Sequence, residues 1–527
     1  MRMENKYPMF EAMRKAYTQG QEDETLLPLV LTNDHTNALG RIRTGDSVIF
    51  YNIRGEREIE LTRSLTEDDF MEFPVEKSTR LNFATMIEYQ KDLNVNVAFS
   101  PDEIIKDTLS EIIANNKIGQ VKITEAEKAT HVGFFFNGKK SESFEQEEKI
   151  TIPTRKDIAL FDQAPEMSID EITRATVEKI NDKKYGFIAV NFPNVDVVGH
   201  IENESAVIKA VETVDKNIGI VIKEALKMAI PVIVTADHGT VEKWRYSDGA
   251  VDTGHTDSPV PFILIHPDKN IRLKKKGSLI DIAPTVLDVL GLPPSKLMTG
   301  SSLVEKKQIS VNSQKRLLLI IADGWGYSEN TDTNLIARSR TPVMDTLIKT
   351  YPVSILEASG EAVGLPAGTV GNSEAGHLHI GAGRVIYSDR LKIDRAISDK
   401  SFYENPAFLK VMREAKKTGK SLHLMGIVSF FSSHGSINHL FALMEMAKHE
   451  GISNVFIHAM LGRRGEMPES GAQYIKKIED KALSIKLGKV VSVIGRYWSM
   501  DREDNWDRIE KTYRMLVYGE GEKIPEV

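Results

Sequence analysis

Apolar runs alternate with amphipathic stretches between about residue 94 and residue 290. The expected strands are 121–124, 131–137, 186–191, 231–235 and 261–265, and the expected helices are 102–114, 169–180, 206–228 and 280–290. Continuous apolar strands separated by helices are buried on both faces. The pattern therefore predicts a mostly parallel sheet with helices on both sides.

A second alternating region begins at about residue 391. Its expected helices are 407–417, 439–449 and 506–517, and its expected strands are 421–429, 454–461 and 489–495. The beginning of the chain adds an amphipathic helix at 10–17 and a buried strand at 47–51. Residues 301–315 are rich in Ser, Lys, Gln and Asn without an apolar period, so we interpret them as a linker, and the final YGEGEKIPEV as a short tail.

Composition excludes several classes of protein. The 527 residues are 41% hydrophobic and 27% charged, and the formal charge of -7 argues against a general nucleic-acid or membrane-surface binder. The absence of cysteine excludes disulfides, thiolate ligands and cysteine nucleophiles, and it fits a reducing compartment. The N-terminus has no apolar signal core, and no apolar run approaches about 18 residues, so we expect a cytoplasmic protein.

Acids and histidines recur where the expected strands end. They are Asp196 and His200 in NVDVVGH, Asp237 and His238 in ADHG, His255 in TGHTDSPVP, and Asp323 at the end of RLLLIIAD, the strongest buried-strand signal in the chain. A single such residue is often a cap or a solvated loop group. Six together indicate a metal site, and carboxylate and imidazole without sulfur favour Mn²⁺ or Zn²⁺ over Ca²⁺.

The glycine-rich stretch 364–384, GLPAGTVGNSEAGHLHIGAGR, contains Ser373. Such a run lets backbone amides approach an anion, because no Cβ blocks them. A serine hydroxyl needs a base or a metal to act as a nucleophile, and a pair of divalent ions about 4 Å apart is the usual clamp for phosphoryl displacement. The alternative is a plain glycine-rich loop.

Arginines follow several expected strands. Arg54 and Arg57 come after 47–51, Arg463 and Arg464 after 454–461, and Arg496 and Arg502 after 489–495, with His434 after 421–429. Because a guanidinium matches carboxylate or phosphate, we expect an anionic small-molecule ligand. Lys128 in TEAEKATHVGFFFNG could add a charge toward a phosphate, or it could be a solvated lysine beside two glutamates.

These motifs, together with GRYWSMDREDNWDR and VIFYNIRGER, identify a resemblance over almost the whole chain. The chain resembles the cofactor-independent (2,3-bisphosphoglycerate-independent) phosphoglycerate mutases of the alkaline phosphatase superfamily. The resemblance implies an alkaline-phosphatase-like sheet domain plus a smaller α/β transferase domain, two divalent ions of which Mn²⁺ is favoured over Zn²⁺ or Co²⁺, no 2,3-bisphosphoglycerate, and a monomer.

The resemblance also implies roles for individual residues. Asp323, Ser373, Asp237 and His238 match the ligands of one metal, and Asp196, His200 and His255 those of the other. Ser373 matches the serine that is transiently phosphorylated, with Lys128 beside the phosphate. The family's residues that hold the phosphoglycerate match six positions in this chain, namely Arg54, Arg57, His434, Arg464, Arg496 and Arg502. Domain closure would keep water from the phosphoserine.

The order of the motifs is rotated relative to the family, because DGWG at Asp323 follows the motifs that it should precede. We therefore expect a circular permutant in which both chain ends approach one another in one domain. The metal and phosphoserine domain would be continuous over 92–389, including the linker 301–315. The substrate-binding transferase domain would combine 1–91 and 390–527.

Two departures lie on the substrate side. The family's LDGRDTPP is LGRRGEMP at 461–468, so Gly465 replaces an acid, for which Glu466 is a hypothetical substitute. The loop SDGGVHSH is SFFSSHGS at 429–436, which keeps His434 but loses an acid and a second histidine. Two alternatives stay open: a phosphatase or phosphomutase acting on another small phosphorylated acid, and a non-catalytic metal-binding relative.

Overall fold

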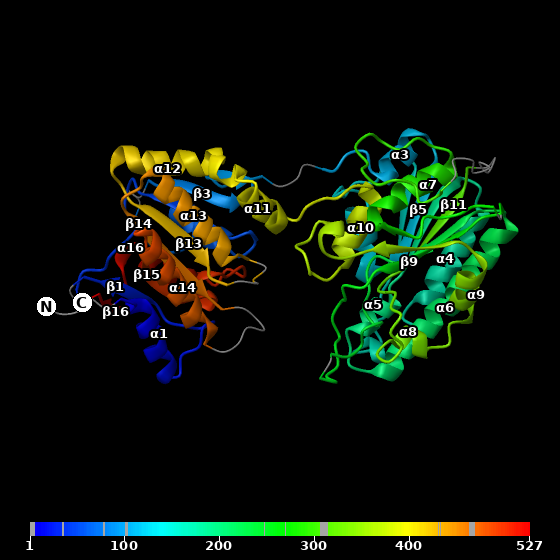
Figure 1. Ribbon diagram of the computed structural model, residues 1–527, viewed down its shortest axis with the longest axis horizontal. Coiled ribbons are helices and arrows are strands. Elements are labelled where there is room, and N and C mark those ends of the chain that lie inside the picture. Colours follow the sequence, from blue (N-terminus) through cyan, green and yellow to red (C-terminus); the bar gives the residue numbers. More distant parts are fainter. Residues whose placement is uncertain are drawn as a thin grey trace. The chain divides into compact units, whose positions relative to one another are not determined.

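The computed structural model describes residues 6–33, 36–76, 80–100, 104–246, 248–268, 270–305, 315–429, 432, 434–462 and 469–526. The chain divides into two compact units (Figure 1). Unit 1 combines Met1–Pro101 with Asp389–Val527, and unit 2 is Asp102–Ser388. Each unit is built on one eight-stranded, mostly parallel sheet, which confirms the predicted two-domain α/β fold.

The sheet of unit 2 has one antiparallel member. Its order is β10 (Lys276–Ser278), β12 (Val353–Glu357), β9 (Val260–Ile265), β8 (Val232–Thr235), β11 (Leu317–Ala322), β7 (Tyr185–Phe192), β5 (Gly119–Glu125) and β6 (Glu147–Ile152). Only β9 runs against its two neighbours. Consequently β9 begins at the edge of the sheet where β5, β7, β8 and β11 end.

Helices cover both faces of this sheet, as predicted (Figure 1). On one face lie α3 (Leu109–Asn115), α7 (Ile282–Leu290) and α10 (Ser373–Ala382), and on the other α4 (Ile169–Asn181), α6 (Glu204–Lys227) and α9 (Pro342–Thr350). The short helices α5 (Asn194–Gly199) and α8 (Leu335–Arg338) complete the unit. The strands are apolar on both sides because both sides are buried, as the fully buried Val190, Ile233 and Ile320 show.

Three expected elements of unit 2 differ from the structure. Residues 131–137 are no strand: His131–Phe135 form the π-helix η2, in which the amide of Phe136 donates to the carbonyl of His131 at 3.0 Å. The expected helix 102–114 begins only at Leu109, where Thr108 caps it, and 101–103 lie outside the described residues. The expected strand 261–265 exists but is antiparallel. An apolar run indicates burial but not the type of element, its exact ends or its direction.

The sheet of unit 1 joins strands from distant parts of the chain. Its order is β16 (Glu522–Pro525), β1 (Leu29–Thr32), β15 (Lys489–Gly495), β14 (Val455–Leu461), β13 (Leu422–Ile427), β2 (Ser47–Phe50), β3 (Asn82–Ile87) and β4 (Asn96–Phe99). The six strands from β15 to β4 are parallel, and β1 is antiparallel to β15. The predicted short tail contains β16, which pairs with β1 in parallel.

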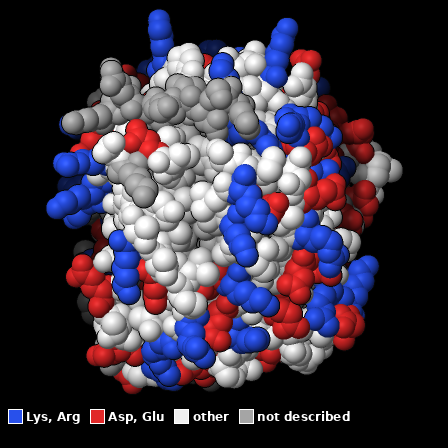
Figure 2. All heavy atoms as spheres, turned by 90° about the vertical axis from the view of Figure 1, so that its right-hand side faces the viewer, with Lys and Arg blue, Asp and Glu red and all other residues white. Residues whose placement is uncertain are grey.

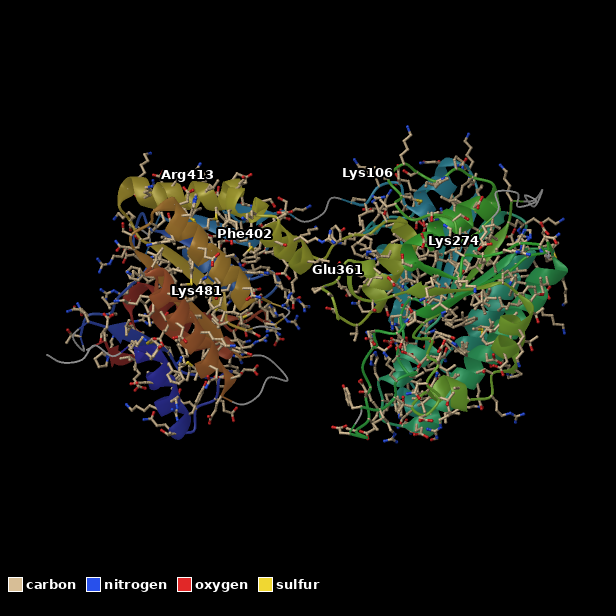
Figure 3. The ribbon with its side chains drawn as sticks, viewed as in Figure 1. Lys106, Lys274, Glu361, Phe402, Arg413 and Lys481 are labelled. Atoms are coloured by element: carbon tan, nitrogen blue, oxygen red, sulfur yellow. The ribbon has the colours of Figure 1, made fainter. Side chains whose placement is uncertain are left out.

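One face of this sheet is covered by α1 (Pro8–Thr18), α12 (Pro406–Thr418), α13 (Ile437–Glu450) and α14 (Ser470–Ile485). On the other face α2 (Ile59–Thr66) packs with α16 (Trp506–Tyr518), next to the short α15 (Arg496–Ser499). The remaining helix is α11 (Asp389–Ser398). Phe402, labelled in Figure 3, is fully buried before α12, with its ring centroid 5.2 Å from that of Phe408.

The two ends of the described chain meet within unit 1. Helix α1 packs beside β16, and β16 pairs with β1, so both ends contribute to one edge of one sheet. Strand β4 also lies in unit 1, because it pairs with β3. The residues of the expected domain 92–389 that form β4 therefore lie with the other unit.

The surface of unit 2 at the right of Figure 1 carries interspersed basic and acidic side chains around a largely uncharged centre (Figure 2). In the ranges that the structure describes, none of the helices combines the length and apolar character needed to traverse a membrane.

Candidate functional site

The polar residues predicted in unit 2 lie at one edge of its sheet. Lys128 follows β5, Asp196 follows β7, Asp237 follows β8 and Asp323 follows β11, while His255 precedes the antiparallel β9. The crossover topology therefore brings together side chains up to 195 residues apart in sequence. His200 and His238 join them from the same segments as Asp196 and Asp237.

Ser373 is the first residue of α10, and the side chain of Asn372 caps this helix by accepting from the amide of Ala375 at 2.8 Å. The Ser373 hydroxyl oxygen lies 2.6 Å from Nζ of Lys128, 3.0 Å from Nε2 of His238 and 3.4 Å from Oδ1 of Asp323. It is buried. The hydroxyl thus stands at a helix N-terminus, where the helix dipole favours negative charge.

Glycine serves close packing here. A Cβ on Gly376 in α10 would stand 2.5 Å from the carbonyl oxygen of Asp237, and a Cβ on Gly324, which has a φ of +80°, would stand 2.8 Å from the amide nitrogen of Asp196. Neither position accepts a side chain without a shift. The glycines let α10 and the turn after β11 press against the strand ends that carry the acids.

Lys128 connects the acids and the serine. Its Nζ donates to Oδ2 of Asp196 at 2.6 Å and to Oδ1 of Asp323 at 2.7 Å. Burial opposes the charge of this ammonium, but the carboxylates of Asp323, Asp196 and Asp237 outweigh that effect and raise the pKa of Lys128. Lys128 is therefore a cation at this site and not the solvated lysine that was the alternative.

The ligand atoms fall into two groups of three that could each hold a metal ion. Asp196, His238 and His255 form one group, and Asp237, Asp323 and His377 form the other. His377 was not among the residues predicted from the sequence. Its position four residues after Ser373 on the same helix, in NSEAGH, was the available signal.

The predicted ligand sets divided these residues differently, with His238 beside Asp237 and Asp323. In the structure Nε2 of His238 lies 3.5 to 3.6 Å from carboxylate oxygens of Asp196, Asp237 and Asp323, so its distances do not favour one set over the other. His200 lies in neither group of three, but its Nε2 is 3.4 Å from Oδ1 of Asp196.

Three histidines are oriented by backbone carbonyls. Nδ1 of His200 lies 2.7 Å from the carbonyl oxygen of Thr253, Nδ1 of His255 lies 3.0 Å from that of Gly371, and Nδ1 of His238 lies 3.1 Å from the carbonyl of its neighbour. A carbonyl only accepts, so each Nδ1 carries a proton, and in the neutral imidazole each Nε2 presents a lone pair. This is the usual arrangement of metal-binding histidines.

The donor set fits cations in three further respects. Nε2 of His200 and Nε2 of His255 lie 3.1 Å apart, a distance at which two lone pairs repel unless a proton or a cation lies between them. Oδ2 of Asp237 is buried and accepts no hydrogen bond within the described residues. Three buried carboxylates, of Asp196, Asp237 and Asp323, face the single ammonium of Lys128. Burial and the charge of Asp237 raise the pKa of Asp323.

A cavity of about 540 Å³ opens onto these groups, and its lining includes Lys128, Asp196, His200, His255 and Ser373. His131 also lines it, although the sequence predicted a strand at this position. Burial is the main cause that lowers the pKa of His131 to about 4, so its imidazole is neutral. The π-helix that carries it is a kind of local structure often found at functional sites.

A second cavity, of about 380 Å³, lies in unit 1 at the carboxyl ends of its parallel strands. It brings together five residues predicted from the sequence, namely Arg54, Arg57, His434, Arg496 and Arg502. Arg508 and Tyr497 also line it and were not predicted. Both belong to the segment RYWSMDREDNWDR, so the motif pointed to the region but not to these side chains.

The arginines of this cavity are held by acids and carbonyls. Nη1 of Arg57 donates to the carbonyl of Met500 at 3.2 Å, and Glu56 pairs with Arg502 at 2.9 Å and with Arg54 at 3.2 Å. Their exposed fork atoms leave the cavity cationic, which suits an anion. Arg464, Gly465 and the hypothetical substitute Glu466 lie outside the described residues, as do residues 430, 431 and 433 of the loop 429–436.

Two family models match the chain. Residues 35–294 match the Metalloenzyme superfamily, and residues 393–526 match the model described as the N-terminus of BPG-independent PGAM. The model named for an N-terminus thus matches residues that follow the metalloenzyme match. Together with the two groups of ligand atoms, the first match supports binding of divalent metal.

Curated relatives carry one name. The chain is 39% identical over 295 residues to the 2,3-bisphosphoglycerate-independent phosphoglycerate mutase of Syntrophotalea carbinolica and 41% identical over 298 residues to that of Moorella thermoacetica, in each case with 56% of this chain and 57% of the relative covered. The chain therefore spans about half the length of the curated relatives it matches. A solved structure of Leishmania mexicana phosphoglycerate mutase at low cobalt concentration is 27% identical over 52% of this chain and 53% of that chain, with a TM-score of 0.37, too low to bear on the site.

Proposed function

The chain belongs to the family of 2,3-bisphosphoglycerate-independent phosphoglycerate mutases, and from this premise we propose that it interconverts 3-phosphoglycerate and 2-phosphoglycerate through a phosphoserine at Ser373. The observation that carries the proposal is the environment of the Ser373 hydroxyl. It lies within hydrogen-bond distance of Lys128 and His238, beside three buried carboxylates. This is an environment for a nucleophile, and it is an unusual one for a structural serine.

The proposed metal ligands are the residues predicted from the sequence, Asp323, Ser373, Asp237 and His238 for one ion and Asp196, His200 and His255 for the other, with His377 added beside Asp237 and Asp323. Two divalent ions bound there would neutralise the carboxylates, lower the pKa of the serine hydroxyl and stabilise charge on the phosphoryl oxygens. Imidazole and carboxylate ligands without sulfur favour Mn²⁺, with Zn²⁺ or Co²⁺ as alternatives.

The remaining chemistry belongs to the protein's own groups. Lys128 directs an ammonium at the serine oxygen, where it would attract the phosphoryl group as it arrives and leaves. Asn372 holds the first turn of α10, so the serine oxygen keeps one position through both transfers. Neutral His131, on the lining of the same cavity, would donate a hydrogen bond to the phosphate without adding charge.

Unit 1 would hold the glycerate part of the substrate. Arg54, Arg57, Arg464, Arg496 and Arg502 match the phosphoglycerate-binding arginines of the family, and four of these five line the unit 1 cavity with His434. A guanidinium fork suits the carboxylate that both phosphoglycerates carry. We therefore propose that unit 1 is the substrate-binding transferase domain, which was predicted from the sequence as 1–91 and 390–527, and that unit 2 is the phosphatase-like metal domain. We also propose a monomer.

A circular permutation would explain the order of the matches. The segment that matches an N-terminal model follows the metalloenzyme match, and alignments that keep residue order extend over about half of each relative. The pairing of β16 with β1 supports this proposal, because a chain can be rejoined where its ends share a sheet edge.

The test is to incubate the metal-loaded protein with Mn²⁺ and 3-phosphoglycerate and to measure 2-phosphoglycerate and free phosphate together. Ser373→Ala should abolish both products. Ser339→Ala, which removes a partly buried hydroxyl that donates to the carbonyl of Leu335, the first residue of α8, is the matched control and should leave turnover unchanged.

The ratio of the products separates the alternatives. Phosphate without 2-phosphoglycerate would favour a phosphatase or phosphomutase that acts on another small phosphorylated acid. The altered substrate-side sequences at 429–436 and 461–468 would permit such a change of substrate. No reaction with a panel of phosphorylated acids, in protein shown to hold metal, would favour a non-catalytic relative.

A further inference from the structure

A carboxylate and an imidazole form a buried pair at the cavity of unit 1. Oε1 of Glu58 lies 3.2 Å from Nδ1 of His434. Glu58 was not predicted as a site residue. Resting on the proposed function, we propose that His434 passes a proton between the two glycerate oxygens and that Glu58 is the positioning residue that makes this possible.

Glu58 is held in place as a hydrogen-bond acceptor. Its side chain is fully buried, and Oε1 accepts from Nδ2 of Asn52 at 2.6 Å while Oε2 accepts from the amide of Arg57 at 3.0 Å. Both oxygens therefore receive donors, as a buried carboxylate requires. Within the described residues His434 is the one ion-pair partner of Glu58, with no lysine or arginine within 4 Å. Because a carboxylate oxygen accepts, the facing Nδ1 of His434 is the donor of this hydrogen bond.

The backbone of His434 is held as well. Its carbonyl accepts from the amide of Ile53 at 2.8 Å, and its amide donates to the hydroxyl of Ser432 at 3.1 Å. With Nδ1 committed to Glu58, the imidazole presents Nε2 as its second functional atom. Nε2 has no protein hydrogen-bond partner in the part of the chain that the structure describes, and the residue lines the cavity. This arrangement of acid, imidazole and open nitrogen is the one that general acid–base histidines use.

The other acids of the cavity lining have different partners. Glu56 pairs with Arg54 and Arg502, and Asp501 accepts from Arg508 at 2.9 Å and from the side chain of Asn505 at 3.0 Å. Their charge is compensated by guanidinium groups that cannot release a proton. Glu24 also lines the cavity and is the rival candidate for proton transfer.

The proton count closes around His434. His434 enters the cycle as the imidazolium, with one proton on Nδ1 and one on Nε2. In the first transfer the bond from phosphorus to a glycerate oxygen breaks as the bond to Oγ of Ser373 forms, and the electron pair stays on the glycerate oxygen, which takes the proton from Nε2 and leaves the neutral imidazole. In the return transfer the neighbouring hydroxyl gives its proton to Nε2 as its oxygen attacks phosphorus and Oγ leaves. Ser373 attacks and leaves as the alkoxide, so it does not enter this count.

The decisive variant is Glu58→Gln, which keeps shape but offers one acceptor where the site needs two. Its amide nitrogen must face the amide of Arg57 or else the donors of Asn52 and His434. We expect kcat for 3-phosphoglycerate to fall about 10²-fold while KM changes less than about 3-fold, since the glycerate-binding arginines remain. The matched control is Glu479→Gln, a buried carboxylate of unit 1 that accepts backbone amides and, among the residues that the structure describes, has no histidine partner.

Three kinetic outcomes would overturn the proposal: a change in KM alone, an equal loss in Glu479→Gln, or full activity of Glu58→Gln together with a loss in Glu24→Gln. If Glu58→Gln does not fold, Glu58→Asp keeps the charge but retracts it by one methylene, and we expect the same pattern at about 10-fold in kcat.

A measurement without substrate keeps this proposal separate from the proposed function. In ¹⁵N-histidine spectra of the wild-type protein, Nδ1 of His434 should carry a proton, and in Glu58→Gln that proton should move to Nε2. An unprotonated Nδ1 in the wild type would overturn the pair even in an active mutase. A wild-type protein with this tautomer and no turnover of 3-phosphoglycerate would instead sink the proposed function.

Discussion

The two units place opposite charge at equivalent positions of similar sheets. In unit 2 the segments after β7, β8 and β11 carry Asp196, Asp237 and Asp323, with a single lysine among them. In unit 1 the segments after β2 and β15 carry arginines instead. The carboxyl edge of a parallel sheet therefore supplies position, and the residues that follow each strand decide whether it attracts cations or anions.

The largest effect should come from removing one acid of unit 2. Asp237→Asn should lower turnover about 10³-fold, equivalent to roughly 4 kcal/mol, because an amide cannot replace a charged ligand in a buried cation site. Turnover of 3-phosphoglycerate at saturating Mn²⁺ measures it. Asp215→Asn is the matched control, since Asp215 is a buried carboxylate of unit 2 that accepts the amides of Val343 and Met344. Equal losses of turnover in both variants would contradict a role of Asp237 in cation binding, because Asp215 has only a structural role.

Metal should stabilise one unit and not the other. At a Mn²⁺ concentration of about 100 times the dissociation constant, unit 2 should gain about 2.7 kcal/mol, because the ion binds its folded state alone. Calorimetry should show one of two transitions moving to higher temperature, and chelation should reverse the shift. A shift of both transitions, or a shift that persists in Asp237→Asn, would contradict the statement that metal binds to the acids of unit 2 and not to unit 1.

Loss of a guanidinium in unit 1 should act on substrate binding. Arg57→Ala should raise KM for 3-phosphoglycerate about 10- to 100-fold, the value of a charged hydrogen bond of roughly 1.5–3 kcal/mol, and should leave metal stabilisation of unit 2 intact. The control is Arg413→Ala on α12, labelled in Figure 3, which pairs with Glu450 at the surface. A fall in kcat without a change in KM would assign Arg57 to the chemical step.

The smallest expected effect is a pH dependence of folding stability, which can be measured for each unit separately. Burial raises the pKa of Glu479 in unit 1 to about 7, against the amides of Met9 and Phe10 that lower it. The pKa of Glu479 is higher in the folded state than in the unfolded state, so its contribution to folding stability is fully present below about pH 4.5 and is lost as pH rises through about 7. The free energy of unfolding of unit 1 should therefore fall by about 1–2 kcal/mol between pH 5 and pH 8.

Glu479→Gln should flatten this dependence, measured as the free energy of unfolding at both pH values. Burial likewise raises the pKa of Glu125 in unit 2 to about 7, so Glu125→Gln should flatten only the unit 2 transition. If either variant altered both transitions, the units would not unfold independently.

The sequence predicted the strand-end residues better than the elements beside them. Asp196, Asp237 and Asp323 could be predicted to lie at strand ends because each comes within a few residues of the end of an apolar run, which is a local signal. His377 and Glu58 gave no such signal. His377 lies on the buried side of a helix, and Glu58 precedes α2 in an ordinary charged stretch, so only packing reveals their partners. Which strands pair, and that β9 runs antiparallel, likewise depends on contacts between distant segments.

The glycines of 364–384 were interpreted as making room for an anion. In the structure Gly376 makes room for the backbone of Asp237, so its purpose is to bring the helix of Ser373 against the acids. A glycine pattern states that something approaches closely but not what approaches. The prediction of a reactive serine did not depend on this distinction, because the acids were found independently.

The arrangement of strands in unit 1 has a consequence for synthesis on the ribosome. Strands β13, β14 and β15 lie between β1 and β2 in the sheet but are made only after all of unit 2, which is one continuous segment. Domains that are complete fold as they emerge. Unit 2 can therefore acquire its structure while β1 and one edge of β2 wait for partners that are made several hundred residues later, although β2, β3 and β4 can already pair with one another. A growing chain of this kind offers exposed strand edges to chaperones for longer than a chain whose domains are completed in sequence order.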